Sequence, residues 1–208
     1  MHVDGCMITS ASTSEIRRIK EEIQQSFKPK DLGEARSLLG LNIQRDKSLG
    51  ILYIKQREYL EKVLKLFKWG TAKQSTFQSL TKKSGPGDNR KLSEDEQKLY
   101  QEIIGCLIYL AFNTRYDAAY AVMVLGQKMA QAVHEDLTAA KFVLQYLKGN
   151  PNLGIEFSKG DFTLKSYTDA SCASPQLKYR SSQGYIITLG GALILFGSRI
   201  RQAMSKTT

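Results

Sequence analysis

The sequence predicts an α+β fold in which antiparallel hairpins alternate with amphipathic helices. Residues 39–54 and 185–196 each hold two runs of strand-forming residues on either side of a turn, which is the pattern of a β-hairpin. Residues 13–27, 93–112 and 134–149 repeat apolar side chains every three or four positions, which is typical of a helix with a buried face. With 208 residues, 42% of them hydrophobic and 24% charged, the chain can bury one large core or two small ones.

The first predicted helix, residues 13–27, begins with Ser and Thr residues followed by Glu15, a combination that caps helix N-termini. We expect its apolar face to pack against a sheet; that face consists of Ile16, Ile19, Ile23 and Phe27. The hairpin at 39–54 turns at residues 46–50. A further helix follows it, with an apolar stripe formed by Leu60, Val63, Leu64 and Phe67. Its solvent-exposed face carries the i,i+4 pairs Glu58–Lys62 and Glu61–Lys65.

Residues 71–92 show no hydrophobic period and contain Ser-Gly-Pro-Gly-Asp-Asn, so we expect a linker or a long surface loop there. A capping box at residues 93–96 begins the next helix, whose apolar side chains fall on two faces and therefore predict burial. A second helix follows the sequence Thr-Arg-Tyr-Asp. Asp117 is expected to cap that helix by accepting backbone N–H bonds.

One carboxylate, Asp169, follows the helix at 134–149. Residues 162–169 alternate in the manner of a strand, so we expect Asp169 at a strand end, followed by the small residues Ala170 and Ser171. A rigid carboxylate in that position is typical of hydrolytic divalent-metal sites. A solvated Asp that begins a turn fits the same residues.

The formal net charge of +10 is concentrated at the two ends of the chain. Lys and Arg outnumber Asp and Glu by 17 to 10 in residues 1–90 and by 6 to 2 in residues 161–208, whereas residues 91–160 hold 7 against 8. Two basic segments around a neutral one suit a bound polyanion such as nucleic acid, although solvated lysines give the same count.

Neither a run of eighteen apolar residues nor a signal-peptide pattern occurs in the sequence, so we expect no membrane partner. The three cysteines, Cys6, Cys106 and Cys172, are far apart and lack the spacing of a metal site, which favours reduced packing residues. These features predict an intracellular protein, in the cytoplasm or the nucleus.

Several stretches, in order, resemble the Pol polyproteins of copia-type LTR retrotransposons. His-Val-Asp-Gly at 2–5 stands where that family has the polymerase box Tyr-Val-Asp-Asp, and residues 30–69 resemble the segment after the palm. Residues 100–129 resemble the family's Gly-x-Leu-x-Tyr-Leu helix, Thr-Arg-Pro-Asp and second helix, with Tyr in place of Pro. Tyr-Leu-Lys-Gly-Asn-Pro at 146–151, followed by Ser-Tyr-Thr-Asp-Ala-Ser at 166–171, resembles the junction of reverse transcriptase with ribonuclease H.

The resemblance implies partial reverse-transcriptase palm and primer-grip hairpins with a helical thumb, followed by the opening antiparallel strands of a ribonuclease H-like fold. Residues 1–70 would form the end of the palm, the primer-grip hairpin and the first thumb helix. Residues 71–92 would be a linker, residues 93–150 the helical thumb or connection, and residues 151–208 a truncated ribonuclease H-like segment.

The same resemblance makes Asp4 and Asp169 the catalytic and metal-binding candidates, because the family uses these carboxylates to bind Mg²⁺. Nucleotidyl transfer needs carboxylates that hold two metal ions, and Gly5 replaces the second Asp of the polymerase box. In the family, the remaining polymerase Asp precedes the box, and the second ribonuclease H ligand follows the position of Thr208. We therefore expect this chain to bind no Mg²⁺ and to lack both activities.

Five basic residues are candidate nucleic-acid contacts, chosen by charge and by their place in the resembling segments: Lys55, Lys62, Lys65, Lys68 and Arg115. The lysines of the helix suit either phosphate contact or an ordinary solvated face. Arg115 suits either nucleic acid or a structural ion pair with Asp117.

Three functional hypotheses follow. The first is a catalytically inactive fragment of a retrotransposon RNA-directed DNA polymerase and ribonuclease H that retains binding to an RNA–DNA hybrid or other nucleic acid. The second is part of a longer, active polyprotein. The third is a structural remnant that binds no ligand and self-associates through exposed apolar edges.

Overall fold

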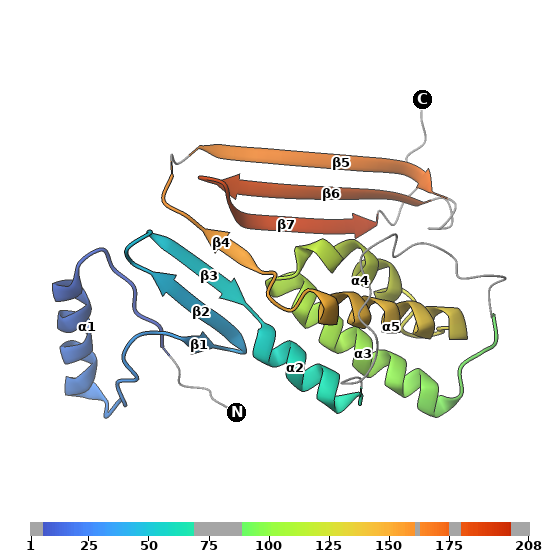
Figure 1. The fold of residues 1–208 in the computed structure, drawn as a ribbon, viewed down its shortest axis with the longest axis horizontal. Coiled ribbons are helices and arrows are strands. Elements are labelled where there is room, and N and C mark those ends of the chain that lie inside the picture. Colours follow the sequence, from blue (N-terminus) through green and yellow to red (C-terminus); the bar gives the residue numbers. More distant parts are fainter. Residues whose placement is uncertain (1–5, 69–88, 161–162, 175–179, 201–208) are drawn as a thin grey trace.

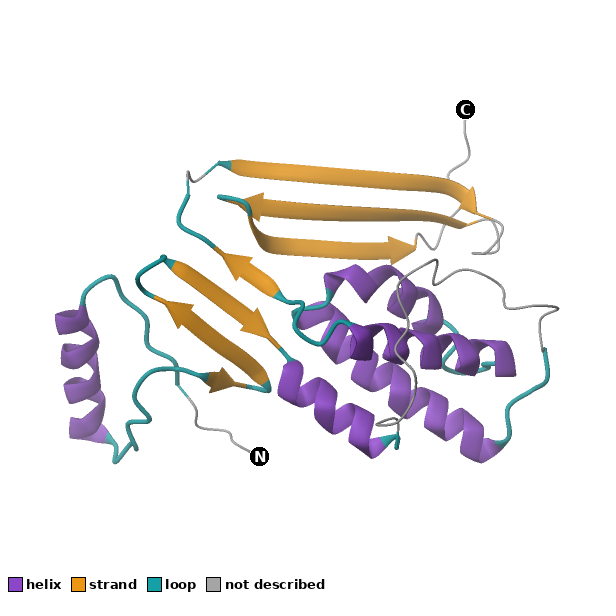
Figure 2. Cartoon of the chain, in the orientation of Figure 1, coloured by secondary structure: helices purple, strands orange, loops and turns teal. Residues whose placement is uncertain are grey.

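The structure, a computed structural model, describes residues 6–68, 89–160, 163–174 and 180–200. Two antiparallel sheets lie beside a group of helices, which confirms the predicted mixture of helix and sheet (Figure 1 and Figure 2). Helix α1 (Thr13–Ser26) lies at one side of the molecule, beyond the first sheet.

The first sheet has the strand order β1-β2-β3-β4, and every neighbouring pair is antiparallel. Its strands are β1 (Ser37–Leu38), β2 (Leu41–Asp46), β3 (Ile51–Lys55) and β4 (Ile155–Phe157). Strands β2 and β3 form the predicted hairpin. Asp46 closes the turn by accepting hydrogen bonds from the backbone N–H groups of Ser48 and Leu49 at 2.9 and 3.0 Å. Gly50 has a φ of 67° in the same turn, a conformation that favours glycine.

Strand β4 joins this sheet from a distant part of the sequence. It follows helix α5 (His134–Gly149) and pairs with β3, so that Ile155 lies opposite Ile54. The backbone approaches β3 closely at Gly154. A Cβ atom there would meet the carbonyl oxygen of Ile54 and would lie 2.8 Å from Cγ of Lys55. The β3–β4 pairing therefore connects the β2–β3 hairpin to the segment that follows α5.

The main core lies among α5 and three other helices, α2 (Arg57–Leu66), α3 (Glu94–Asn113) and α4 (Ala119–Gly126). At its centre, α3 buries Tyr100, Ile104 and Leu107 in one apolar cluster with Leu144 of α5. The Tyr100 hydroxyl donates a 2.7 Å hydrogen bond to the carbonyl oxygen of Leu125 in α4, so its burial leaves no unpaired hydroxyl. The helices predicted at 93–112 and 134–149 are confirmed.

The first turn of α3 contains the predicted capping box. The Ser93 hydroxyl accepts a hydrogen bond from the backbone N–H of Glu96 at 3.2 Å, and the Glu96 carboxylate accepts one from the backbone N–H of Ser93 at 3.0 Å. That backbone bond, together with hydrogen bonds from Arg90, lowers the pKa of Glu96 to about 2. The resulting negative charge also suits the positive end of the helix dipole.

The expected packing of α1 against a sheet is wrong. None of its residues is buried, and Phe27 at its end is 70% exposed. Its polar face forms ion pairs within the helix, since Arg18 reaches Glu15 at 2.5 Å and Glu22 at 2.6 Å. The apolar side chains Ile16, Ile19 and Ile23 are only half-buried.

Two side-chain predictions are also corrected. In α2, Glu61 pairs with Arg57 at 3.0 Å, one turn before it, rather than with the lysine one turn after it. Asp117 does not cap α4, whose N-cap residue is Ala118. The Asp117 carboxylate instead accepts hydrogen bonds from the side chain of Arg115.

The second sheet consists of β5 (Leu164–Ser174), β6 (Arg180–Leu189) and β7 (Ala192–Ile200), antiparallel and in that order. The second predicted hairpin is confirmed, with Gly190 and Gly191 at φ 59° and 82° in the turn between β6 and β7. Strand β7 lies nearest the helices (Figure 1), and the ring of Phe196 stacks on Phe112 of α3 with a centroid distance of 6.1 Å. Aromatic packing therefore attaches the second sheet to the helical core.

The predicted segment limits at 70, 92 and 150 remain predictions. The structure adds that β4, just after residue 150, shares a sheet with strands before residue 56, and that α2 shares a core with α3 to α5. Within the part of the chain that the structure describes, no helix is long and apolar enough to cross a membrane.

We predict that Gly154→Ala lowers the free energy of unfolding by about 2 kcal/mol, because the added methyl group would overpack the backbone of β3. Gly105→Ala is the matched control. Gly105 lies inside α3 with nothing within 4 Å of an added Cβ, so this change should raise stability by about 1 kcal/mol. Chemical denaturation of both variants tests this prediction. If the two variants unfold at the same denaturant concentration, the close approach of Gly154 to β3 is contradicted.

Candidate nucleic-acid interface

Helix α2 turns one face inward and a basic face outward. Leu60, Val63 and Leu64 are 2%, 3% and 8% exposed, and this burial fixes the rotation of the helix about its axis. The three predicted lysines fall on the remaining surface and are exposed: Lys62, Lys65 and Lys68. The backbone N–H of Lys68 bonds to the carbonyl oxygen of Lys65 at 3.0 Å, which closes the last turn. Lys62 and Lys65 therefore lie on the exposed side of α2, and Lys68 follows two residues after the helix ends.

A polar cleft of about 200 Å³ lies at the other end of α2, where β3 runs into the helix. Six residues line it: Asn42, Gln44, Lys55, Arg57, Glu58 and Asn152. Lys55 lies opposite Asn42 in the β2–β3 register, and its ammonium group is 4.8 Å from the ring centroid of Tyr53. The cleft therefore combines the predicted Lys55 with a second cation, Arg57, and with three side-chain amides.

Contacts within the cleft hold its wall in place. Arg57 pairs with Glu61 at 3.0 Å and lies 3.5 Å from the side-chain oxygen of Asn152. The backbone N–H of Glu58 donates to the side-chain oxygen of Asn42 at 3.4 Å. Such a group of cations and amide donors can bind a phosphate oxygen while a carboxylate orients the guanidinium.

Sequence reasoning missed Arg57 and the amides. A local signal existed for Asn42 and Gln44, because both alternate with the apolar residues of β2 and so share a face with Lys55 of β3. Asn152 had no such signal, since it reaches the cleft only through the return of the chain toward β4.

Arg115 lies in the interior rather than on this surface. Its side chain is 3% exposed and forms a two-point ion pair with Asp117, with Nε at 3.0 Å and a terminal nitrogen at 2.8 Å from the carboxylate oxygens. The other terminal nitrogen donates to the carbonyl oxygen of Asn150 at 2.9 Å. The ion pair that the sequence offered as the alternative role of Arg115 is therefore observed, and the enclosed guanidinium disfavours the predicted contact of Arg115 with nucleic acid, which stays a prediction.

The ion pair joins the 3-10 helix η1 (Tyr116–Ala118) to the end of α5. The hydroxyl of Tyr146, in α5, donates to the Asp117 carboxylate at 2.7 Å. Burial opposes ionisation of that carboxyl, but the hydrogen bonds from Arg115 and Tyr146 outweigh it and hold the pKa of Asp117 below its ordinary value. The charged pair thus stabilises the junction between α3, η1 and the end of α5.

Only one of the two predicted catalytic carboxylates, Asp169, falls within the described residues. Asp4 lies outside the described residues. Asp169 is exposed and lies within β5 opposite Gly184, five residues before the strand ends, so the prediction of a strand-end position is wrong. Over the described ranges, no group of three or more His, Cys, Asp or Glu residues could hold a metal ion. Asp169 does not by itself supply the several oxygen ligands that Mg²⁺ requires.

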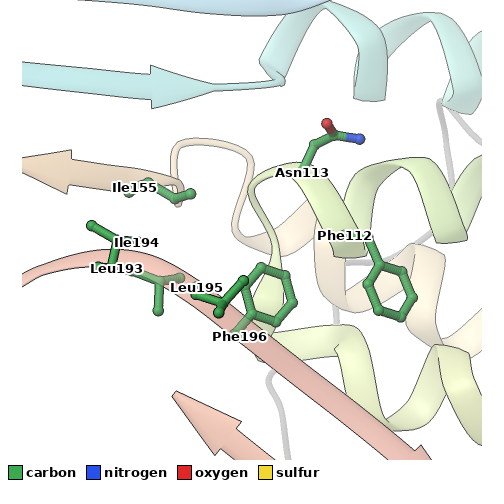
Figure 3. A pocket seen from close by; sticks show the side chains of 7 residues that line it. All are labelled: Phe112, Asn113, Ile155, Leu193, Ile194, Leu195 and Phe196. Carbon is green, nitrogen blue, oxygen red and sulfur yellow. The ribbon is translucent and has the colours of Figure 1, made fainter. Parts of the chain in front are cut away.

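A second cavity, of about 210 Å³, separates β7 from β4 and the end of α3 (Figure 3). Its lining is apolar except for one amide: Phe112, Asn113, Ile155, Leu193, Ile194, Leu195 and Phe196. The Asn113 side chain donates to the carbonyl oxygen of Tyr109 at 2.7 Å, which caps the last turn of α3. The apolar lining, which comes from β7, β4 and the end of α3, indicates a packing junction between the two sheets.

A family model described as "Reverse transcriptase (RNA-dependent DNA polymerase)" matches residues 1–80, the part that contains α1, the β2–β3 hairpin and α2. The chain therefore contains part of a reverse transcriptase-family domain. Curated relatives extend this match over the rest of the chain.

The whole chain aligns with the retrovirus-related Pol polyprotein from transposon TNT 1-94 of Nicotiana tabacum at 30% identity and with that from transposon RE1 of Arabidopsis thaliana at 33%. The chain belongs to this family of copia-type transposon Pol polyproteins and corresponds to a reverse transcriptase-like segment of them. It spans only 16% and 14% of the length of these two relatives. It is also 25% identical to the uncharacterized mitochondrial protein AtMg00810 of Arabidopsis thaliana, covering 85% of that protein. No solved structure matches the chain.

We predict that Asp117→Asn lowers the free energy of unfolding by about 3 kcal/mol at neutral pH, because it leaves the enclosed Arg115 guanidinium without a counter-charge. Since the folded-state pKa of Asp117 lies below its ordinary 3.8, the stabilisation is present above that value and is lost as pH falls through the folded-state pKa. The difference between wild type and variant should therefore shrink in acid.

Glu22→Gln is the control, because its ion pair with Arg18 is exposed and contributes little. Urea unfolding from pH 7 to pH 2.5 measures both variants. A loss in Asp117→Asn that is no larger than in Glu22→Gln would contradict the assigned role of the enclosed pair.

Proposed function

We propose that this segment binds the backbone of an RNA–DNA hybrid, or of another nucleic-acid duplex, through the outer face of α2 and the adjacent polar cleft. The observation that carries the proposal is the fixed rotation of α2. Burial of Leu60 and Val63 leaves its lysines no orientation except outward. The basic face and the cleft with Lys55 and Arg57 lie at the two ends of the same ten-residue helix.

The chemistry of these residues suits phosphate rather than bases. Lysines on flexible stems neutralise phosphate charge without reading sequence, and each such contact releases condensed counter-ions. The excess of 17 Lys and Arg over 10 Asp and Glu in residues 1–90 adds a general attraction for a polyanion. We therefore expect binding that is salt-sensitive and largely independent of sequence.

The finer architectural assignments belong to the same proposal. We interpret the β2–β3 hairpin as a primer grip, α2 to α5 as a thumb, and β5 to β7 as the opening strands of a ribonuclease H-like fold. The chain order of these elements and the antiparallel order of the three last strands support this interpretation.

We further propose that this chain does not polymerise DNA, because Gly5 takes the place of the second carboxylate in the polymerase box. One carboxylate cannot hold two metal ions near each other. Asp169, exposed within a strand, would be a single ribonuclease H ligand for Mg²⁺.

The second candidate function is that of one segment within a longer, active reverse transcriptase and ribonuclease H. The observation in its favour is the small share of the Pol relatives that the chain covers, 16% and 14%. In that setting the basic face of α2 would have the same role, and other segments would supply the catalytic carboxylates.

We predict that the triple substitution Lys62→Ala, Lys65→Ala and Lys68→Ala weakens binding to an RNA–DNA hybrid and lowers the slope of log Kd against log salt by about 2.5, since three phosphate contacts are lost. Fluorescence anisotropy with a labelled hybrid across a salt series measures both quantities.

The matched control removes three exposed lysines away from α2: Lys28, Lys30 and Lys98. It changes the net charge equally, so only a general charge effect should remain. If the control lowers the slope as much as the α2 variant does, binding follows net charge and the proposed interface is wrong.

We also predict that the chain, incubated with a primed template or a hybrid and Mg²⁺, yields neither an extended primer nor cleaved RNA. Gel analysis of product length tests this. A product that disappears when the metal is chelated would show that the chain is active and would favour the second candidate function.

A further inference from the structure

The polar cleft at the start of α2 is lined by a carboxylate as well as by cations. Lys55 ends β3, which runs directly into the helix (Figure 1), and Arg57 begins α2. Glu58 follows and lines the same cleft. Arg57 pairs at 3.0 Å with Glu61, which is not part of the lining. The charge of Arg57 is therefore balanced, and the lining keeps one further cation, Lys55, and one anion, Glu58.

Two hydrogen bonds anchor the first turn of α2. Gln56 is 2% exposed, and its side-chain oxygen accepts a 2.8 Å hydrogen bond from the Thr114 hydroxyl at the end of α3. The backbone N–H of Glu58 donates to the side-chain oxygen of Asn42 at 3.4 Å. These contacts hold the turn against α3 and β2, so the exposed Glu58 side chain extends from a fixed backbone on the cleft wall.

The carboxylate restricts what the cleft can bind. An ionised carboxylate only accepts hydrogen bonds, so a ligand that contacts Glu58 favourably must donate one. The phosphates and deoxyriboses of a DNA backbone hold acceptors alone, whereas each nucleotide of an RNA backbone adds one donor, the ribose 2′-hydroxyl. An RNA strand can therefore place a phosphate oxygen at Lys55 and a neighbouring 2′-hydroxyl at Glu58. A DNA strand in the same place offers Glu58 no donor.

We propose that the cleft selects an RNA strand, with Glu58 accepting a hydrogen bond from a ribose 2′-hydroxyl and Lys55 contacting the adjacent phosphate. This inference rests on the proposed binding of a duplex through α2 and names the strand that lies in the cleft. Glu58 is then a specificity-determining residue, whereas the lysines of α2 contribute affinity for either kind of strand. An acid in the first turn also suits the helix dipole, but that role does not depend on the sugar of the ligand.

Fluorescence anisotropy of the full chain with three labelled duplexes of one sequence tests the proposal. The duplexes are an RNA–DNA hybrid, the same hybrid with 2′-fluoro groups in its RNA strand, and a DNA duplex. The 2′-fluoro strand retains RNA-like geometry but has no 2′-hydroxyl donor, so it separates the hydrogen bond from the shape of the duplex. Wild type should bind the unmodified hybrid roughly fivefold more tightly than the fluorinated one, because a hydrogen bond to a charged acceptor is lost.

Glu58→Ala should bind the two hybrids with equal affinity, because the acceptor of the 2′-hydroxyl is removed. The matched control is Glu22→Ala, which removes the same charge from an exposed residue of α1 and should keep the wild-type preference. Circular dichroism checks that both variants remain folded.

The outcomes separate this inference from the proposed function. Equal wild-type affinities for the two hybrids, with binding that still weakens when the lysines of α2 are substituted, would overturn the inference and leave the proposed function intact. A Glu58→Ala variant that keeps the wild-type preference would overturn the assignment of the 2′-hydroxyl contact to Glu58. A chain that binds none of the three duplexes would overturn the proposed function, and the inference with it.

Discussion

The apolar contacts around α3 determine where the other surfaces of this protein face. Tyr100, Ile104 and Leu107 are inaccessible to solvent, and α2 adds its own stripe to the same cluster. Rotating α2 would return that stripe to water at a cost of about 25 cal/mol per Å². The position of the lysines is therefore a consequence of core packing, and a residue that contacts no ligand, such as Val63, maintains the basic face.

The pairing of β3 with β4 connects this core to the first sheet. Because the chain returns from α5 to the hairpin, the polar cleft combines Asn42 and Lys55 with Asn152, residues far apart in the sequence. The cleft thus requires the hairpin, α2 and the chain after α5 to be folded together. The enclosed ion pair of Arg115 and Asp117 strengthens the same junction, since Arg115 also bonds to the carbonyl of Asn150 just before that return.

Local patterns predicted much of this fold because helix periods, capping boxes and glycine turns depend on neighbouring residues. The box at Ser93 and the turn at Gly190 are examples in which near neighbours determine the geometry. The partner of β4 could not be predicted, since nothing within three residues specifies a strand about a hundred positions away. Similarly, an Arg two residues before an Asp has the same local sequence whether its side chain is exposed or buried. The burial of Arg115 depends on tertiary packing and could therefore not be predicted.

The most direct measurement of the proposed interface is lysine-modification footprinting with and without a bound RNA–DNA hybrid, read by mass spectrometry. If α2 and the cleft bind the duplex, Lys55, Lys62, Lys65 and Lys68 should lose reactivity toward an acylating reagent on addition of the hybrid. Lys28, Lys30 and Lys98 should react as before. Equal protection of both groups, or protection of the second group alone, would contradict an interface on α2.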